Sequence, residues 1–251
     1  MASILQPNDA ARMRSAIQLA IQKKVCHVMT EPKATILPVY FVADESYSMA
    51  DDIEDLNSGL ASLLDALHLA SMAAAKVRFC VVGFSDTAVC HLEPTDLRNI
   101  DEMPRLTARG STSFAAAFAA LTARIPADIV ELKADGYLVN RPAVFFLTDG
   151  APNSGDPWQA ARTRLTEFAA HPNILAFGIG QANAEVIRQV ATSPRFAFIT
   201  ATGTDTGAAI STFITALTQS VINSGQALAS GHTSLQIQKP DNFLSLEVGT
   251  V

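Results

Sequence analysis

Short runs of consecutive apolar residues recur along the chain and limit its possible folds more than any other feature. They cover Ile36–Val42, Val77–Phe84, Ala143–Leu147, Ile174–Ile179 and Arg195–Thr200. Within each run the apolar residues are mostly continuous and do not alternate with polar ones, which is typical of strands buried on both faces of a parallel sheet. Parallel strands need long crossover connections, usually helices, because each strand must start again at the same edge of the sheet. The runs therefore predict a sheet covered by helices.

Helical patterns fill the intervals between these runs. In residues 51–70, apolar side chains such as Ile53, Leu56 and Leu60 fall at steps of three and four, which places them on one face of a helix. Further helices are expected at 113–127, 156–170, 182–192 and 205–220. This alternation predicts an α/β fold, a doubly wound and mostly parallel sheet with helices on both faces.

Three segments depart from the alternation. A hairpin with one antiparallel edge strand is predicted where Val81–Phe84 is followed by a short Ser-Asp-Thr turn and then by Ala88–Leu92. The first 33 residues place apolar side chains on one side of a helix, and the residues after Gly225 alternate weakly. We expect a helical extension at 1–33, a single domain at 34–225 and a tail at 226–251 that contributes a possible added strand.

Composition narrows the class of protein. Hydrophobic residues make up 49% of the 251, which is enough for a large core and too many for a disordered chain. With 18 basic and 24 acidic residues the net charge is −6, which argues against broad electrostatic binding to nucleic acid or to an anionic membrane. The few cysteines, and the lack of a long apolar stretch for a signal peptide or a membrane span, favour a cytoplasmic protein.

Polar residues gather where two of the predicted strands end. Asp44, Ser46 and Ser48 follow the first strand on alternate positions, and Asp149 follows a later one. Ligands of open α/β sheets bind outside the carboxyl ends of the strands. Carboxylate and hydroxyl oxygens suit a hard divalent cation, Mg²⁺ first and Mn²⁺ or Ca²⁺ next. Three loop residues cannot complete an octahedral shell, so we expect Asp149 and Thr112, in a Gly-Ser-Thr-Ser loop, to contribute as well.

This arrangement resembles the metal-ion-dependent adhesion site of von Willebrand factor A (VWA) domains. The resemblance rests on Asp44-x-Ser46-x-Ser48, on Thr112 and on Thr148-Asp149-Gly150, in that order, and it covers about residues 36–222. The family usually has a small residue where this chain has Tyr47. Within the family the chain looks most like bacterial TerY-type proteins of tellurium-resistance and stress-response loci.

The resemblance implies a non-enzymatic interaction module. In that family a partner's Asp or Glu takes a coordination place on the metal, so the cation bridges two proteins. Next to the site, Glu45, Tyr47, Ser111 and Trp158 are candidate partner contacts. TerY-type proteins are associated with a kinase and a PP2C-type phosphatase, which are therefore the partners that the resemblance suggests.

Other interpretations of the same residues stay open at this point. Asp44, Ser46 and Ser48 alone also fit a turn in which side chains bond local amides, and Thr112 fits a helix N-cap. A second alternative is a metal-dependent phosphoester hydrolase. It is disfavoured because the sequence shows no second metal site and no evident base, and neither serine lies in a Gly-x-Ser-x-Gly nucleophile turn. A subunit that works with an AAA+ motor, as in chelatase-like assemblies, is the third alternative.

Several further features favour plain structural roles. Gly178-Ile179-Gly180 lacks the third glycine of a dinucleotide-binding loop, and the histidines lack metal-type spacing. Cys80 and Cys90 fit packing in strands better than a redox pair, and Trp158 fits a packing anchor better than a partner contact.

Overall fold

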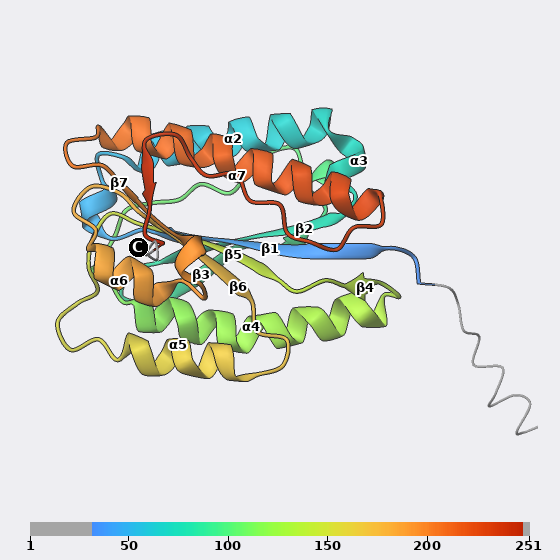
Figure 1. Cartoon of the computed structure of the whole chain (residues 1–251), viewed down its shortest axis with the longest axis horizontal. Helices are drawn as coiled ribbons and strands as arrows, with labels where there is room; N and C mark the ends of the chain where they lie inside the picture. Colours follow the sequence, from blue (N-terminus) through green and yellow to red (C-terminus); the bar gives the residue numbers. More distant parts are fainter. Residues whose placement is uncertain (1–31, 248–251) are drawn as a thin grey trace, which may run out of the picture. The chain divides into compact units, whose positions relative to one another are not determined.

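A mixed sheet forms the centre of the protein (Figure 1). The computed structural model describes residues 32–247, so the helical extension expected at 1–33 lies almost entirely outside the described residues. The strands follow the order β3-β2-β1-β5-β6-β7-β8, and the short β4 pairs with the start of β1. Their bounds are β1 Thr35–Asp44, β2 Val77–Phe84, β3 Ala88–Thr95, β4 Leu138–Val139, β5 Ala143–Thr148, β6 Asn173–Gly178, β7 Ala197–Thr200 and β8 Phe243–Ser245.

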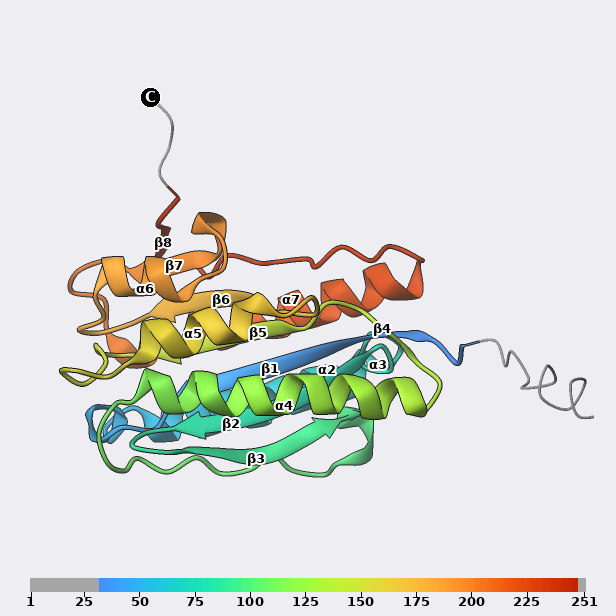
Figure 2. The ribbon, with the colours of Figure 1, turned by 90° about the horizontal axis from the view of Figure 1, so that it is seen from below.

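The inner strands run parallel, and antiparallel strands close both edges of the sheet (Figure 2). The predicted α/β class with a mostly parallel sheet is therefore confirmed. The hairpin expected after β2 is present, with β3 antiparallel to β2. A second antiparallel edge strand, β8, pairs with β7 in the segment that was expected to contribute a possible added strand. β8 lies in the tail, where the sequence pattern for a strand was weak.

Helices cover both faces of this sheet. Figure 1 shows α2, α3 and α7 on one face and α4, α5 and α6 on the other. Their bounds are α2 Ile53–Leu69, α3 Ser71–Ala74, α4 Phe114–Ala134, α5 Trp158–Glu167, α6 Ala184–Val190 and α7 Thr206–Ala229, with short 3₁₀ turns at η1 Tyr47–Met49, η2 Leu97–Asn99 and η3 Pro194–Phe196. None of the described helices is long and apolar enough to cross a membrane.

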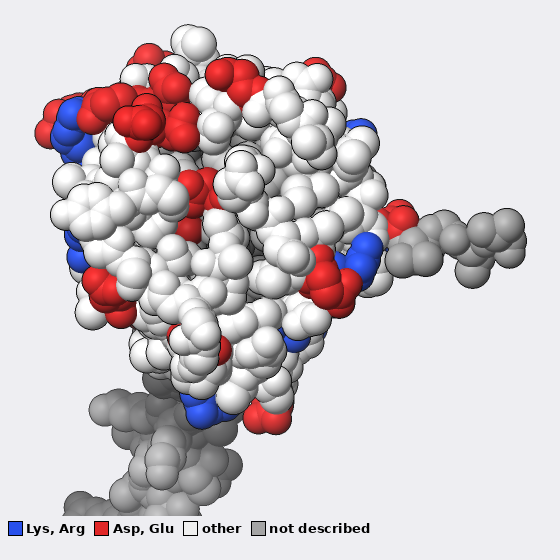
Figure 3. Space-filling view, turned by 90° about the vertical axis from the view of Figure 1, so that its left-hand side faces the viewer, with Lys and Arg blue, Asp and Glu red and all other residues white. Residues whose placement is uncertain are grey.

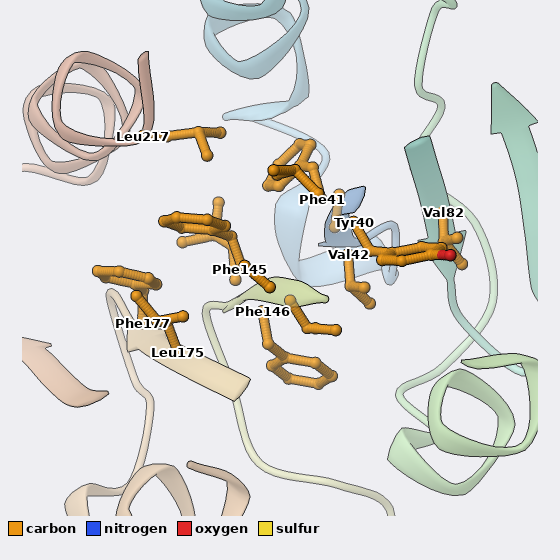
Figure 4. Close-up of a cluster of buried hydrophobic side chains, with 14 of the residues drawn as sticks. Tyr40, Phe41, Val42, Val82, Phe145, Phe146, Leu175, Phe177 and Leu217 are labelled. Carbon is orange, nitrogen blue, oxygen red and sulfur yellow. The ribbon is translucent and has the colours of Figure 1, made fainter. Parts of the chain in front are cut away.

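The two-sided burial explains why the strand sequences are continuously apolar. The consecutive residues Phe145 and Phe146 of β5 point to opposite faces (Figure 4). Phe146 stacks on Phe118 of α4, with ring centroids 5.6 Å apart. On the other face Phe145 stacks on Phe177, whose ring meets Phe213 of α7 at 4.9 Å. A polar residue at either position would lie in a hydrophobic layer, so both must be apolar.

Two helices run further than their sequences predicted. α4 continues to Ala134 with Pro126 inside it, although proline usually ends a helix. α7 continues to Ala229, so the expected domain boundary at 225 falls inside a helix. Gly225 is not a helix terminator but a contact point, because a Cβ there would lie 2.4 Å from the main-chain oxygen of Ala73, just before the end of α3.

We expect Gly225→Ala to destabilise the protein by about 1–3 kcal/mol, because the added methyl group must push α3 and α7 apart. At other positions inside a helix, Gly→Ala stabilises a protein by about 1 kcal/mol. A loss of stability at position 225 would therefore indicate the close contact between α7 and α3. Urea unfolding measures it, with the exposed residue change Gln226→Ala as the matched control on the same helix. A stabilised Gly225→Ala variant would contradict the close approach.

Candidate metal-binding site

The carboxyl ends of two neighbouring strands place the candidate ligands at one edge of the sheet. Asp44 is the last residue of β1, and Asp149 directly follows β5, which pairs with β1 in parallel. Thr148, the last residue of β5, donates a hydrogen bond of 2.6 Å from its hydroxyl to Asp44 Oδ2. The main-chain N–H of Ser46 donates to Asp44 Oδ1 at 2.9 Å. Both oxygens of this fully buried carboxylate are therefore held in place.

A chain of side-chain oxygens connects the two strand ends. The hydroxyl groups of Ser46 and Ser48 lie 2.9 Å apart. Ser48 donates in turn to Asp149 Oδ1 at 2.8 Å. The η1 turn that follows β1 carries Ser48 and brings it toward β5. Four of the five expected ligands are thus joined by short contacts.

The loop before α4 carries the fifth expected ligand, Thr112. The backbone of Thr112 exchanges hydrogen bonds with Asn153, which donates to its carbonyl at 2.9 Å and accepts from its N–H at 3.2 Å. Gly110 accepts a bond from the N–H of Tyr47 at 3.2 Å and has a φ of +60°, so a side chain there would be strained and would meet Asp86. The loop is therefore fixed to the segments that follow both β1 and β5.

Two residues that the sequence did not single out hold this loop in place. Asn153 donates from its amide to the hydroxyl of Ser111 at 2.8 Å. Asp156 accepts bonds of 3.1 Å from the hydroxyl of Ser113 and from the N–H of Ala115 at the start of α4. Asparagine and aspartate are ordinary loop and capping residues, so their sequence pattern carries no signal for this longer-range role.

The electrostatics of the site favour a bound cation. Burial raises the pKa of Asp44 to about 6, and nearby Asp149 adds to the shift. Burial also raises the pKa of Asp149. Among residues 32–247, no ion pair joins either carboxylate to a Lys or Arg. Two buried carboxylates next to neutral hydroxyls form a donor set that fits a hard divalent ion.

Comparison with known proteins shows which family has this fold and this order of residues. The family model for the von Willebrand factor type A domain matches residues 39–213, a range that contains all five candidate ligands. The chain belongs to the VWA domain family. Curated protein sequences give no match to this VWA chain.

Solved structures share the fold of this chain at low sequence identity. The pilus adhesin SpaC from Lactobacillus rhamnosus GG is 15% identical with a TM-score of 0.60, over 76% of this chain and 31% of that chain. Proximal thread matrix protein 1 from the mussel byssus is 19% identical with a TM-score of 0.51, over 75% and 48% of the two chains. A von Willebrand factor type A structure from Catenulispora acidiphila is 15% identical with a TM-score of 0.50, over 75% and 43%. The chain thus spans less than half the length of each of these proteins.

Glu45 has an internal position in this VWA domain, not the surface position expected of a partner contact. Its side chain is fully buried, with Oε2 2.8 Å from Arg109 and Oε1 3.0 Å from His91. The N–H of Thr107 donates to Oε1 at 3.1 Å. Burial alone would raise the pKa of Glu45, but these contacts outweigh it and lower the pKa. Gly83 leaves room for the carboxylate, because a Cβ there would overlap it.

The other three expected partner contacts differ in their exposure. Tyr47, on η1 between the two serines, is 70% exposed. Ser111 is exposed too, and its hydroxyl bonds Asp86 and Asn153. Trp158 is buried, with its ring 6.0 Å from that of Phe114, so it packs in the core as the alternative interpretation held. Only Tyr47 and Ser111 remain available to a partner.

The raised pKa of Asp44 predicts that the metal-free protein loses stability as pH rises through about 6. The folded-state pKa is above the unfolded value of about 3.9, so folding favours the protonated form and the stabilisation is lost when Asp44 ionises. We expect the free energy of unfolding in EDTA to fall by about 1.4 kcal/mol between pH 5 and pH 7.5. An Asp44→Asn variant should lack this fall, and equal pH dependence in both proteins would contradict the assignment.

Removing the charge of Glu45 should destabilise the domain, because Arg109 and His91 would lose their buried partner. We expect Glu45→Gln to cost about 2–4 kcal/mol in urea unfolding. The matched control is Glu54→Gln, whose partner Arg105 lies 2.6 Å away with both side chains largely exposed. That exposed pair should contribute less than about 1 kcal/mol. If the two variants lost the same free energy of unfolding, the structural role of the buried Glu45 would be contradicted.

Proposed function

We propose that this VWA domain is a metal-dependent, non-enzymatic protein-interaction module. Asp44, Ser46, Ser48, Thr112 and Asp149 hold a divalent cation, and a carboxylate of a partner protein binds to that cation. The observation that carries the proposal is the set of short contacts that joins four of these residues: the Ser46 N–H bonds Asp44, and the hydroxyls of Ser46 and Ser48 lead on to Asp149. Membership of the VWA family supports the same function.

The donor set favours Mg²⁺, with Mn²⁺ or Ca²⁺ as close alternatives. All proposed ligands are carboxylate or hydroxyl oxygens, which hard cations prefer, and no thiol or imidazole is among them. The two carboxylates balance the charge of a divalent ion, and the hydroxyls add none. The bound cation supplies an electrophilic centre that accepts an Asp or Glu side chain in place of water. The five proposed ligands position the cation, and no Lys or Arg among the described residues pairs with either carboxylate.

The surface around the site indicates how a partner approaches. Tyr47 and Ser111 are exposed, as is the proposed ligand Ser48, and they form the proposed contact surface. Acidic side chains gather on part of this face (Figure 3). Burial and the charges of Asp149, Asp55 and other nearby carboxylates raise the pKa of Asp52. A partner that carries basic residues around its coordinating carboxylate fits this surface by charge complementarity.

The resemblance to TerY-type proteins extends this proposal to a biological setting. We propose that the module works in a bacterial cytoplasm, in a tellurite-resistance or stress-response system. A kinase or a PP2C-type phosphatase is the partner that this resemblance suggests. The support is the resemblance of the opening Leu37-Pro38-Val39-Tyr40 and the low cysteine content of the chain.

Loss of either carboxylate should abolish cation binding. We expect Asp44→Asn and Asp149→Asn to weaken Mg²⁺ and Mn²⁺ binding by more than about 100-fold, beyond the loss caused by outer-shell partners. Isothermal titration calorimetry measures the affinity, and the exposed Asp135→Asn is the control. Unchanged affinity in both site variants would overturn the proposed ligand set. Hydrolysis of a generic aryl phosphate with Mn²⁺, lost in Asp44→Asn, would instead support the enzymatic alternative.

Partner capture should depend on the cation and on Tyr47 in separable ways. We expect immobilised protein to retain a partner from a lysate of its source organism with Mg²⁺ and to release it with EDTA. Tyr47→Ala should reduce retention several-fold while leaving Mg²⁺ affinity within about twofold, because the exposed ring contacts the partner and not the ion. Leu69→Ala is the control, because this side chain is 91% exposed on α2. Retention that is equal with Mg²⁺ and EDTA would contradict the mechanism.

A further inference from the structure

Two cysteines lie side by side on neighbouring strands, away from every residue proposed for the metal site. The sulfur atoms of Cys80 on β2 and Cys90 on β3 are 3.9 Å apart. The strands are antiparallel, and Cys90 pairs in register with Val82, two residues beyond Cys80. The register of the ladder shifts between Phe79 and Val82. Cys80 and Cys90 are therefore diagonal neighbours across this irregular part of the ladder.

The two thiols differ in access. Cys80 is fully buried in the central part of the sheet, whereas Cys90 lies half-buried on the edge strand. The Cys90 sulfur also lies 3.3 Å from the carbonyl oxygen of Leu92. A small oxidant reaches an edge-strand sulfur before a buried one. The pair therefore combines an accessible thiol with a protected thiol in contact with it.

Charged groups on α4 act on the pair electrostatically: Arg124 lowers the pKa of both thiols, and Asp128 raises it. Arg124 lies 3.2 Å from Asp128, and Asp128 accepts a hydrogen bond of 2.8 Å from the hydroxyl of Tyr40 on β1. The hydrogen bond from Cys80 is the main cause that lowers the pKa of Cys90, and Arg124 lowers it further. The same bond and burial raise the pKa of Cys80. A thiolate at Cys90, which accepts a hydrogen bond from the protonated Cys80, is the favoured ionised form, and thiolates are the reactive form of cysteine.

We propose that Cys90 and Cys80 are a peroxide-sensitive thiol pair, in which Cys90 reacts with a hydroperoxide and Cys80 then closes a disulfide. In the first step the Cys90 sulfur attacks the peroxide, the O–O bond breaks, and Cys90 becomes a sulfenic acid while the released alkoxide or hydroxide takes a proton. In the second step the Cys80 sulfur attacks the Cys90 sulfur, and the S–O bond breaks. The hydroxide that leaves takes the Cys80 proton and becomes water. The two thiols lose two electrons, which reduce the hydroperoxide to an alcohol or water.

The position of β3 makes the second step feasible. A disulfide needs its sulfurs about 2.05 Å apart, so the pair must close from 3.9 Å. β3 is at the edge of the sheet and pairs with β2 on one side only, so it can move toward β2 without displacing another strand. The resulting bond would link β2 to β3 and close the short loop that contains the Ser85–Thr87 turn.

Mass spectrometry of the full-length chain tests the proposal. Cys26, which lies outside the described residues, is first changed to serine so that only the pair remains. We expect hydrogen peroxide near stoichiometry to remove both free thiols and to lower the mass of the monomer by about 2 Da, with dithiothreitol reversing both. Without Cys80, in a Cys80→Ser variant, dimedone should trap a sulfenic acid at Cys90. Without Cys90, in a Cys90→Ser variant, Cys80 should keep its thiol under the same treatment.

The role of α4 is tested separately by the rate of oxidation. We expect Arg124→Gln to slow the loss of the Cys90 thiol several-fold, because the neighbouring positive charge favours the thiolate. Arg105→Gln, a change on an exposed arginine, is the matched control and should leave the rate unchanged. Circular dichroism confirms that each variant is folded. Oxidation only between chains, or no dimedone adduct at Cys90 in the folded Cys80→Ser variant, would overturn the proposal.

Discussion

The burial of β1 between two layers of helices is the constraint on which the rest of the structure depends. Every residue of this strand from Ile36 to Asp44 is buried, and β2 and β5 pair with it in parallel on either side. A strand buried in this way must be apolar on both faces, and its parallel neighbours need helical crossovers. The sheet order, the two helical layers and the shared edge of strand ends all follow from this central position.

The same constraint explains why the residues of the proposed metal site are held in place and why burying their charge is unfavourable. Asp44 ends the buried strand, so its carboxylate lies at the boundary of the core with no basic partner among the described residues. Burying a carboxylate without a positive partner is unfavourable, which is why its pKa rises. Glu45, the next residue, is buried with Arg109 and His91 and has a lowered pKa. Two adjacent carboxylates thus have opposite electrostatic roles: one stays available for a cation, and the other anchors a loop.

The proposed thiol pair depends on a different part of the sheet. Cys80 and Cys90 lie where the register of the β2–β3 ladder shifts, on strands that join at an edge. None of the proposed metal ligands contributes to it, so oxidation and cation binding are separate tests of separate inferences. What the two sites share is their dependence on backbone geometry, since each brings together side chains from different strands.

Strand periodicity and the order of motifs predicted the fold class and the candidate ligands because both follow from local sequence. The longer α7 could not be predicted in the same way, and the edge strand β8 gave only a weak signal. Gly225 is typical of a helix end until its contact with Ala73 is known, and the three residues of β8 are too few for a periodicity. The contacts of Trp158 with Phe114 and of Asn153 with the Thr112 loop could not be predicted either, because the neighbouring sequence does not indicate which distant segment a side chain will meet.

By itself the sequence determined an α/β sheet with oxygen-bearing residues at its strand ends, because burial requires apolar runs and parallel strands end at one edge. Only the tertiary structure decided that Glu45 lies inside, that Tyr47 and Ser111 lie at the surface, and that the sulfurs of Cys80 and Cys90 are in contact. The physical reason is that exposure and cross-strand register depend on packing between distant segments, whereas hydrophobic periodicity depends on the chain alone.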